Sequence, residues 1–465
     1  MDYYINLAPE IFQFVFIGAI FFVSVLNRND IKWIPLGALL GVVACGISLD
    51  AQGLYFYSAY RVDGLSQFYK LIISLGFFIV SLNAQAPATI SDEKRVDYFL
   101  MLAISSFALM LLSSAVELIT IILCLEISSF SLYALVPLRA KSKEAAEAGI
   151  KYILFGASSG AFALLGYSFV LASAHTSYLD LLKAPLTNGP VMGVFGMGLF
   201  ISIMFFKLAL VPFHFWAPDI YQGAGNKTAA LIATLPKLGA MAVLIRIAHM
   251  LPGTGLTTII AVLAAFSITY GNVAALVQKD VKRILGYSGI AHAGYIMIGI
   301  VAGSAEGLAA AAFYSLAYML MNLACFWVLC RIAPKGENVT LEGLSGLYKT
   351  APVQAFVLAV GAFALVGLPP FAGFSGKLFL LTSAWITGHH WLVIVAAVNT
   401  ALSIFYYLNL VRYAYTAESE GERAVDKTFG LGAFSLVLAL SLIVLGVAPA
   451  WVYDTALKAV TGLVP

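Results

Sequence analysis

The feature that most constrains this chain is a succession of apolar runs, each long enough to cross a lipid bilayer. An α-helix needs about 20 apolar residues to span the hydrocarbon core. By that measure the 465-residue sequence contains about fourteen spans. They cover 9–26, 31–49, 64–84, 96–113, 115–138, 145–172, 190–221, 226–249, 256–277, 281–302, 305–331, 352–387, 390–416 and 429–452. Charged residues make up only 11% of the chain, whereas a soluble domain carries about 25%, so we predict an all-α polytopic membrane protein.

The basic residues between the spans predict the orientation of the chain. If the N-terminus lies outside and fourteen helices cross, seventeen Lys and Arg residues fall in the inside loops. Only Arg61, Lys183, Arg246 and Lys458 then fall outside. Cytoplasmic loops carry an excess of Lys and Arg, so we expect both termini outside. The N-terminus has neither a basic region nor a cleavage site of a signal peptide, so the first run should remain as a transmembrane helix.

Two of the spans are too long for one straight helix and contain proline. The seventh, 190–221, contains Pro212, and the twelfth, 352–387, contains Pro369 and Pro370. Irregular backbone at membrane depth is tolerated where it is buried in protein or lines a cavity. We therefore expect two half-helices in each of these spans. Pro236 in the eighth span is a further expected helix break.

The two broken spans also predict an internal repeat. Each carries a lysine, Lys207 in span seven and Lys377 in span twelve, which makes Lys377 the expected counterpart of Lys207. An offset of five spans reverses the orientation of equivalent helices, as in inverted-repeat transporters. The expected parts are helices 1–3 in 1–95, a first repeat of helices 4–8 in 96–249, a second of helices 9–13 in 256–416, and helix 14 in 429–465.

Charged residues within the spans are the strongest indication of function. Lysines occur at five such positions: Lys70, Lys151, Lys207, Lys237 and Lys377. Lys70 is near the expected outer end of its helix and could snorkel to the interface, so we give it no function. An unpaired lysine at a helix centre costs roughly 2.5–3.5 kcal/mol on insertion scales. The other four lysines, which we place deeper, should therefore contact polar groups or water.

Carboxylates in two of the spans are candidate partners for these lysines. Glu126 lies near the middle of the fifth span, beside two serines. Burial disfavours a charged lysine and a nearby carboxylate favours it, so movement of Glu126 relative to Lys207 would change whether the lysine holds its proton. In the sixth span Glu147 precedes Lys151 by four residues, the favoured order for a side-chain pair. A purely structural ion pair is the alternative for Lys151, and a solvated helix start is the alternative for Glu144.

Two histidines are further candidates for proton exchange. His292 lies among small residues of the tenth span, with Ser288 one turn away, where it could orient the imidazole. Histidine has an unperturbed pKa of about 6.5 and exchanges protons near neutrality, although a packing role is the alternative. His214 and Asp219 flank the break in the seventh span. Loop orientation is the favoured role for Asp219, and both roles stay open for His214.

Motifs of other chemistries are missing from the sequence. It contains no phosphate-binding glycine loop, no haem or iron–sulfur ligand pattern and no metal-ligand spacing. The four cysteines, each in an apolar run, are expected to be buried apolar groups. What remains is a series of titratable groups at membrane depth, as a proton relay needs: Glu126, Lys151, Lys207, Lys237, His292 and Lys377.

Five stretches together resemble a known family: Leu123–Ser128, Ala148–Tyr152, Phe206–Asp219, Ser288–Tyr295 and Gly367–Lys377. In the order and spacing of its charges the chain resembles the antiporter-like membrane subunits of respiratory complex I, and among them NADH-quinone oxidoreductase subunit N. One sister subunit has glutamate at the position of Lys377, and the other continues into a long lateral helix, whereas this chain ends at Pro465. Both features favour subunit N.

The resemblance implies a role for each residue of the series. Glu126 is similar to the glutamate of helix five, Lys207 to its partner on helix seven and Lys151 to the connecting lysine of helix six. Lys237 is similar to the central lysine of helix eight, His292 to the bridging histidine and Lys377 to the lysine that leads outside.

The resemblance also implies a proton-translocating subunit of NADH:quinone oxidoreductase in a bacterial inner membrane, driven by quinone reduction in other subunits. NAD, FMN, iron–sulfur centres and quinone would bind those subunits, and this chain would bind none of them and no nucleic acid. The expected partners are the antiporter-like subunit M, small membrane subunits and the lipid bilayer. The alternative is a membrane subunit of a multi-subunit Na+/H+ antiporter or of a related membrane-bound hydrogenase. A scaffold without transport has no use for four deep lysines.

Overall fold

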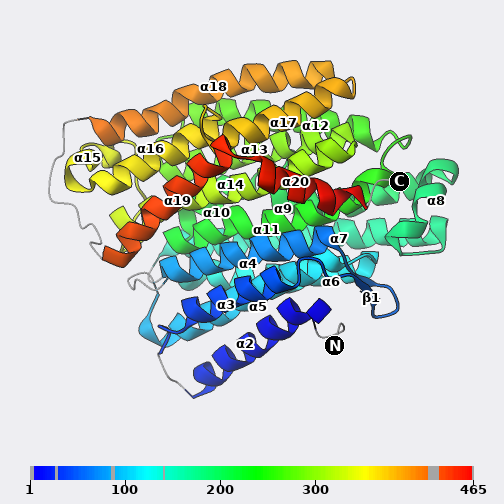
Figure 1. Ribbon diagram of the computed structural model, residues 1–465, viewed down its shortest axis with the longest axis horizontal. Coiled ribbons are helices and arrows are strands. Elements are labelled where there is room, and N and C mark those ends of the chain that lie inside the picture. Colours follow the sequence, from blue (N-terminus) through cyan, green and yellow to red (C-terminus); the bar gives the residue numbers. More distant parts are fainter. Residues whose placement is uncertain (1–4, 27–29, 85–89, 140–141, 417–428, 463–465) are drawn as a thin grey trace.

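The computed structural model is almost entirely helical, and its long helices lie side by side (Figure 1). The structure describes residues 5–26, 30–84, 90–139, 142–416 and 429–462. Within this part of the chain, twelve helices are long and apolar enough to cross a membrane, and Ile34–Ile47 and Pro352–Val366 are shorter apolar helices. The prediction of an all-α polytopic membrane protein is thereby confirmed, while the orientation of the chain stays a prediction.

The N-terminal part contains three long helices and a small β-hairpin. Its elements are α2 (Ala8–Val25), α3 (Ile34–Ile47), β1 (Gly53–Tyr55), β2 (Tyr60–Val62), α4 (Gly64–Ala84) and the short η1 (Asp92–Lys94). The two strands pair antiparallel, with Tyr55 opposite Tyr60. This hairpin was not expected from the sequence, because three-residue strands carry too little periodicity to be recognised.

The central part follows the expected spans one by one. Its first half comprises α5 (Arg95–Ser114), α6 (Leu118–Leu135), η2 (Val136–Leu138), α7 (Lys143–Ala174), η3 (Leu179–Leu181), α8 (Lys183–Asn188), α9 (Val191–Leu208), α10 (Trp216–Gly223), α11 (Asn226–Ile247) and η4 (Ala248–Met250). Its second half comprises α12 (Leu256–Leu276), α13 (Val281–Ala302), α14 (Ala305–Ile332), η5 (Glu342–Leu344), α15 (Leu347–Thr350), α16 (Pro352–Val366), α17 (Ala372–Ile386) and α18 (His390–Tyr415). The division of these helices into two inverted repeats stays a prediction.

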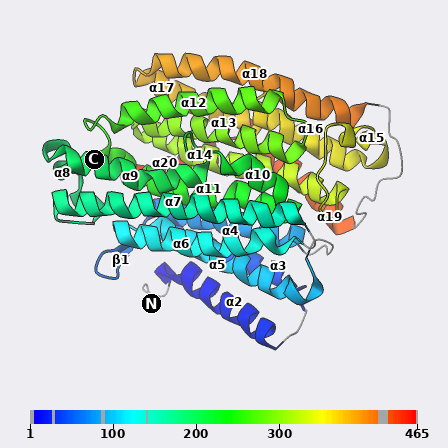
Figure 2. The same cartoon turned by 180° about the vertical axis from the view of Figure 1, so that it is seen from behind.

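The chain closes with α19 (Phe429–Val447) and α20 (Ala450–Thr461). The expected last span, 429–452, was wrong at its end, because the helix stops at Val447 and Pro449 begins a separate one. In Figure 1 α19 and α20 cross one face of the molecule, and Figure 2 shows α7 and α12 on the opposite face.

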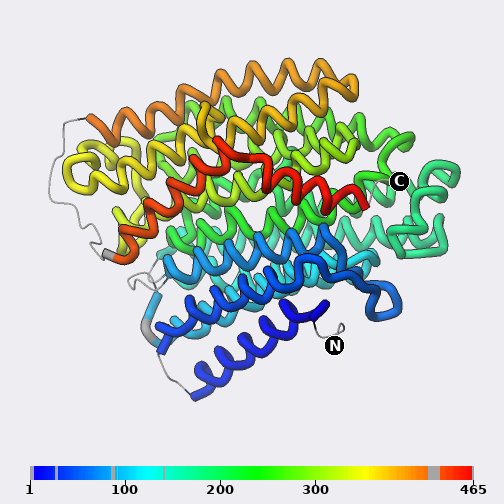
Figure 3. The backbone as a smooth tube through the Cα atoms, in the orientation of Figure 1, coloured from blue at the N-terminus to red at the C-terminus, as the bar shows by residue number. Residues whose placement is uncertain are grey.

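Three helices form the centre of the molecule. In their most apolar windows α11 and α14 are 100% buried and α13 is 94% buried, whereas α2, α7, α18 and α19 are at most 33% buried. Figure 3 shows the N-terminal helices at one end of the row and α18 at the opposite edge. Charged side chains on α11, α13 and α14 are therefore enclosed by protein rather than lipid.

The two predicted helix breaks in spans seven and twelve are confirmed, and they are built alike. α9 ends with Ala209 in the left-handed region, at φ 60°, and α16 ends with Gly367 at φ 88°. Ala209 and Leu210 donate their N–H groups to carbonyls of the last turn of α9, and Gly367 and Leu368 do the same for α16. Both breaks are thus Schellman caps, which satisfy the free carbonyls of a helix end.

The prediction of a third break at Pro236 is wrong, since α11 runs without interruption from Asn226 to Ile247. Proline removes one backbone N–H. Within a protein-enclosed helix, neighbouring helices and local adjustments can satisfy the carbonyl that loses its partner. α11 is such a helix, and its packing on α4, α9 and α14 holds it together.

Candidate functional site

The side chain of Lys207 lies in the last turn of α9 and is buried, with 1% of its surface exposed. Its Nζ donates to Ser129 Oγ on α6 over 2.6 Å, and Ser129 donates in turn to the carbonyl of Leu125. The aromatic rings of Tyr133 and Tyr152 each lie 5.9 Å from Nζ. The ammonium is therefore held by one hydroxyl and by ring faces, which attract a cation.

Glu126 lies on α6 one turn before Ser129, and its carboxylate contacts α7 at Gly160. A Cβ built on Gly160 would be 2.6 Å from Glu126 Oε1, so a side chain at this position would displace the carboxylate. The charges of Glu126 and Lys207 interact through space, yet no ion pair within 4.0 Å joins them in the described part of the chain. The predicted switch needs two charges that are close and not locked together, and this geometry is compatible with it.

Lys237 lies on α11 in the protein-enclosed centre. Its Nζ donates to the carbonyl of Gly289 on α13 over 2.9 Å and to the Tyr318 hydroxyl on α14 over 3.0 Å. The centre of the Tyr318 ring is 4.9 Å from Nζ. Neutral acceptors from two helices therefore hold this lysine.

His292 lies on α13, and tyrosines hold both of its ring nitrogens. Nδ1 is 2.8 Å from the Tyr314 hydroxyl and Nε2 is 3.0 Å from the Tyr407 hydroxyl. The Tyr318 ring that contacts Lys237 is 5.3 Å from the imidazole ring. Our expectation that Ser288 orients the imidazole directly is wrong, because Ser288 donates to the Leu285 carbonyl of its own helix.

Lys377 lies on α17, after the break of the twelfth span. Its Nζ donates to the carbonyls of Leu365 and Val366, at 3.3 and 2.8 Å, in the last turn of α16. A cation is favourable at a helix C-terminus, where free carbonyls concentrate negative partial charge. The Tyr295 ring lies 4.4 Å from Nζ and 6.1 Å from the imidazole of His292.

The position of Lys377 corrects its expected equivalence to Lys207. Lys207 precedes the left-handed Ala209 by two residues, whereas Lys377 follows the left-handed Gly367 by ten. With the two caps in register, the residue that corresponds to Lys377 is Asp219. The presence of a lysine in each broken span misled the prediction, since the lysines lie on opposite sides of the breaks.

Lys151 lies near the start of α7 and is not deeply buried, contrary to expectation. Its side chain is 38% exposed, and Nζ is 2.8 Å from Glu147 Oε1 and 2.9 Å from Asp219 Oδ2. Asp219 also pairs with Arg283 of α13 over 2.7 Å. An open cavity of about 200 Å³ adjoins these groups; Glu144, Glu147, Ala148, Lys151, Asp219, Gln222, Gly223 and Asn338 line it. Asp219 thus joins three helices, a role that we had not favoured.

Aromatic side chains bridge the surroundings of Lys207 and Lys237. Tyr152 stacks on Trp216 at 5.0 Å, and Trp216 contacts Tyr221 at 6.2 Å. The hydroxyls of Tyr152 and Tyr221 are buried and have no hydrogen-bond partner among the described residues. These hydroxyls lie between the two lysine sites, where a proton path would need polar atoms.

Other sequence-based candidates have plainer surroundings. The His214 ring packs between Phe215 and Tyr270, at 4.1 and 4.6 Å. Glu144 accepts a bond from the capping Ser142 in the first turn of α7. The four cysteines are buried and free. Among the described residues no cluster of three or more His, Cys, Asp or Glu side chains could hold a metal ion.

The sequence did not identify the neutral partners of the charged groups. They are Ser129, Gly289, Tyr314, Tyr318 and Tyr407. Tyrosine is common in this chain, with 23 copies, so its presence in a span gave no signal. The spacing of Tyr314 and Tyr318, one helical turn apart on a single face, was the one available pointer.

Comparisons with known proteins agree with this arrangement. Residues 115–403 match the family described as "NADH:quinone oxidoreductase/Mrp antiporter, TM". The chain is 53% identical to NADH-quinone oxidoreductase subunit N 2 of Solidesulfovibrio magneticus, over 99% of both chains. It is 41% identical to NADH-quinone oxidoreductase subunit N 2 of Opitutus terrae, over 98% of this chain and 97% of the relative.

Two solved structures have similar folds. A chain of respiratory complex I from Thermus thermophilus with bound aureothin superposes with a TM-score of 0.86 at 30% identity, over 97% of this chain and 100% of that one. A chain of the Mrp complex from Dietzia superposes with a TM-score of 0.87 at 20% identity, over 98% of this chain and 97% of that one. At that lower identity the likeness concerns the fold alone.

Proposed function

Because this chain belongs to the NADH:quinone oxidoreductase/Mrp antiporter transmembrane family, we propose that it acts as the proton-translocating subunit N of an NADH-quinone oxidoreductase. This chain matches relatives named subunit N over almost the whole length of those relatives. Such a subunit works within a multi-subunit membrane complex, as the similar chain of Thermus thermophilus complex I does.

The observation that carries the proposal is the continuity of proton-exchanging groups through the centre of the protein. Lys237, Tyr318 and His292 follow one another from α11 through α14 to α13, at hydrogen-bond or ring-contact distance. The series continues through Tyr295 to Lys377. Five residues of three types that titrate or carry hydroxyls thus lie in one enclosed layer, where ionisable groups otherwise impose a high cost.

In the proposed relay the charge on each lysine depends on its neighbour. When Glu126 approaches Lys207, the ammonium form is favoured, and when it retreats the proton is released. The released proton passes along the hydroxyls of Tyr152 and Tyr221 toward Lys237. A tyrosine hydroxyl can accept one proton while it donates another, so Tyr318 and His292 can pass it on to Lys377.

The redox groups are proposed to lie in other subunits. NAD, FMN, iron–sulfur centres and quinone would be held there, and conformational or electrostatic changes would reach this chain through its helices. We place the complex in the inner membrane of a bacterium, in line with the bacterial sources of the relatives. Antiporter-like subunit M and small membrane subunits are the proposed neighbours.

The relay can be tested by the variant Lys207→Met, which keeps the aliphatic chain and removes the charge. Exposed Lys458 of α20 provides the matched control, Lys458→Met. Proton uptake coupled to NADH oxidation would be measured in inverted vesicles that contain the assembled complex. We expect uptake to fall in Lys207→Met and to stay at the parental level in the control. Parental uptake by an assembled Lys207→Met complex would refute the relay.

A further inference from the structure

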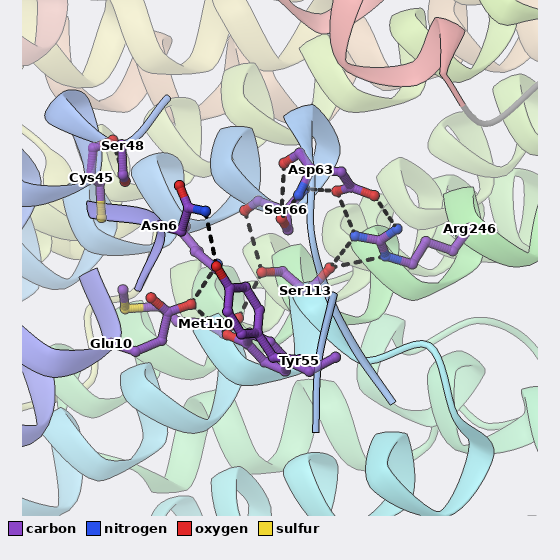
Figure 4. Close-up of polar contacts among 12 residues, drawn as sticks. Asn6, Glu10, Cys45, Ser48, Tyr55, Asp63, Ser66, Met110, Ser113 and Arg246 are labelled. Carbon is purple, nitrogen blue, oxygen red and sulfur yellow. Dashed lines mark hydrogen bonds and ion pairs between the residues drawn. The ribbon is translucent and has the colours of Figure 1, made fainter. Parts of the chain in front are cut away.

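A second set of buried ionisable groups lies in the N-terminal helices. Figure 4 shows Glu10 of this set, with Asp63 and Arg246 in the same region. Lys70 on α4 is fully buried and Glu10 on α2 is 7% exposed. Lys70 Nζ and Glu10 Oε1 are 2.5 Å apart, and the Tyr60 hydroxyl donates to the same carboxylate oxygen. The expectation that Lys70 snorkels to the interface is therefore wrong, since its helix is covered by α3, α5 and α11.

The groups around this pair come from α3, from α4 and from the residue that precedes α4. Cys45 of α3 and Ser74 of α4 meet beside it, and the charge of Asp63 acts on Lys70 from two turns earlier in the chain. Asp63 is itself held by Arg246 of α11 through two hydrogen bonds, at 2.7 and 2.8 Å. The cluster thus contains two separate ion pairs in the described part of the chain, Asp63 with Arg246 and Glu10 with Lys70.

Unpaired polar atoms accompany the two charges. Glu10 Oε2 is buried without a hydrogen-bond partner in the described part of the chain. The same holds for both amide atoms of Gln67, which is 1% exposed and lies one turn before Lys70. A pair kept only for packing is commonly no more stable than apolar side chains of equal volume. Two buried charges with spare polar atoms beside them therefore point to a ligand that exchanges.

A polar stripe connects the pair to the protein surface. Asn6 lies one turn before Glu10 in the chain, and its amide donates to the Tyr55 hydroxyl and to the exposed Gln52 carbonyl, at 2.9 and 2.8 Å. Tyr55 is opposite Tyr60 in the hairpin. The carboxylate of Glu10 thus contacts the hairpin through Tyr60, and Tyr57 in the turn of the same hairpin is 98% exposed.

We propose that Glu10 and Lys70 form a proton-binding site distinct from the series between Glu126 and Lys377. In the charged form Lys70 is an ammonium and Glu10 a carboxylate. Transfer breaks one N–H bond of Lys70 and forms one O–H bond on Glu10, which leaves a neutral amine and a neutral acid. The amine then accepts a proton from water. The acid gives its proton to the Tyr60 hydroxyl oxygen while Tyr60 gives its own proton to water on the side of the hairpin, so charge and atoms balance over the cycle.

The site is placed where its charge can affect the central series. α4 packs against α11 and α14, the helices that carry Lys237 and Tyr318. Tyr69 precedes Lys70 in α4, and its hydroxyl is 3.4 Å from Ser315 Oγ of α14. This coupling rests on the proposed function, whereas proton binding by Glu10 and Lys70 does not.

Infrared difference spectra of the assembled complex, recorded between two pH values, test proton binding directly. A protonated carboxylic acid gives a carbonyl-stretch band. We expect the parent to show a band that disappears in Glu10→Gln and persists in the control Asp63→Asn, which removes a neighbouring carboxyl. A band that survives in Glu10→Gln, or no difference between parent and Glu10→Gln, would overturn the assignment.

Proton pumping separates the proposal from a merely structural ion pair. The double variant Glu10→Gln/Lys70→Met removes both charges together and keeps the size of both side chains. A structural pair predicts parental pumping, and a proton-binding site predicts reduced pumping at parental assembly. Should the double variant not assemble, Glu10→Gln alone decides through the infrared band. Lys207→Met should lower pumping and leave the band unchanged, which distinguishes failure of the relay from failure of this site.

Discussion

A single methyl group on Gly289 should disconnect the central lysine from its partners. A Cβ built at this position lies 3.1 Å from Lys237 Nζ and 2.9 Å from the Tyr318 hydroxyl, where ordinary contact begins at 3.4 Å. The variant Gly289→Ala therefore forces the ammonium and the hydroxyl away by a few tenths of an ångström. α13 and α14 are closely packed, so the backbone offers little room to absorb the shift.

The magnitude follows from the two hydrogen bonds of the ammonium. A hydrogen bond to a charged group contributes about 1.5–3 kcal/mol. Loss of one of the two bonds by displacement corresponds, at the lower end of this range, to about a tenfold fall in the population that keeps the bond, since 1.4 kcal/mol is tenfold. Alanine in place of a helix-interior glycine adds about 0.5–1 kcal/mol of stability, so the fold should be retained while proton transfer is impaired.

The assay is proton uptake per NADH oxidised in inverted vesicles, with complex assembly checked on native gels. Gly18→Ala in α2 is the matched control, because nothing lies within 4 Å of a Cβ at that position. We expect uptake to fall about tenfold in Gly289→Ala, by the same hydrogen-bond energies, and to be unchanged in Gly18→Ala. Equal uptake in both assembled variants would show that the contact of Lys237 with Gly289 and Tyr318 is irrelevant to transport.

Three further outcomes are expected. Gly160→Ala places a Cβ 2.6 Å from Glu126 Oε1, so the carboxylate must move and pumping should fall at unchanged assembly; parental pumping would contradict the switch. Arg246→Met leaves Asp63 without its two charged hydrogen bonds and should cost about 3–5 kcal/mol of stability, measured as a lower denaturation temperature. Burial raises the pKa of the Asp63 carboxyl, but Arg246 and hydrogen bonds from Ser66 lower it by more, so its net pKa lies below the ordinary value. The stability from this pair is therefore present above about pH 4 and lost as the pH falls through the folded-state pKa, a loss that denaturation curves should show in the parent and not in Arg246→Met.

The sequence by itself determined the membrane class, the succession of spans and the two broken helices. Each follows from local chemistry, since about 20 apolar residues fit a bilayer, and a run that is too long for one span and also contains proline is expected to divide into two half-helices. Lys207, Lys237 and Lys377 could also be identified from the sequence. A charged residue within an apolar run is recognisable without knowledge of the side chains that surround it.

Only the tertiary structure decided which groups these charges meet. The sequence placed Lys70 near a helix end and Lys151 deeper, yet Lys70 is buried against Glu10 and Lys151 is half-exposed beside Asp219. Burial of a side chain depends on the helices that cover it, and these come from distant parts of the chain. The same holds for Tyr318, whose hydroxyl reaches Lys237 only because α11, α13 and α14 pack together at the centre. The hydrophobic pattern of one helix does not show which side chains of other helices it contacts.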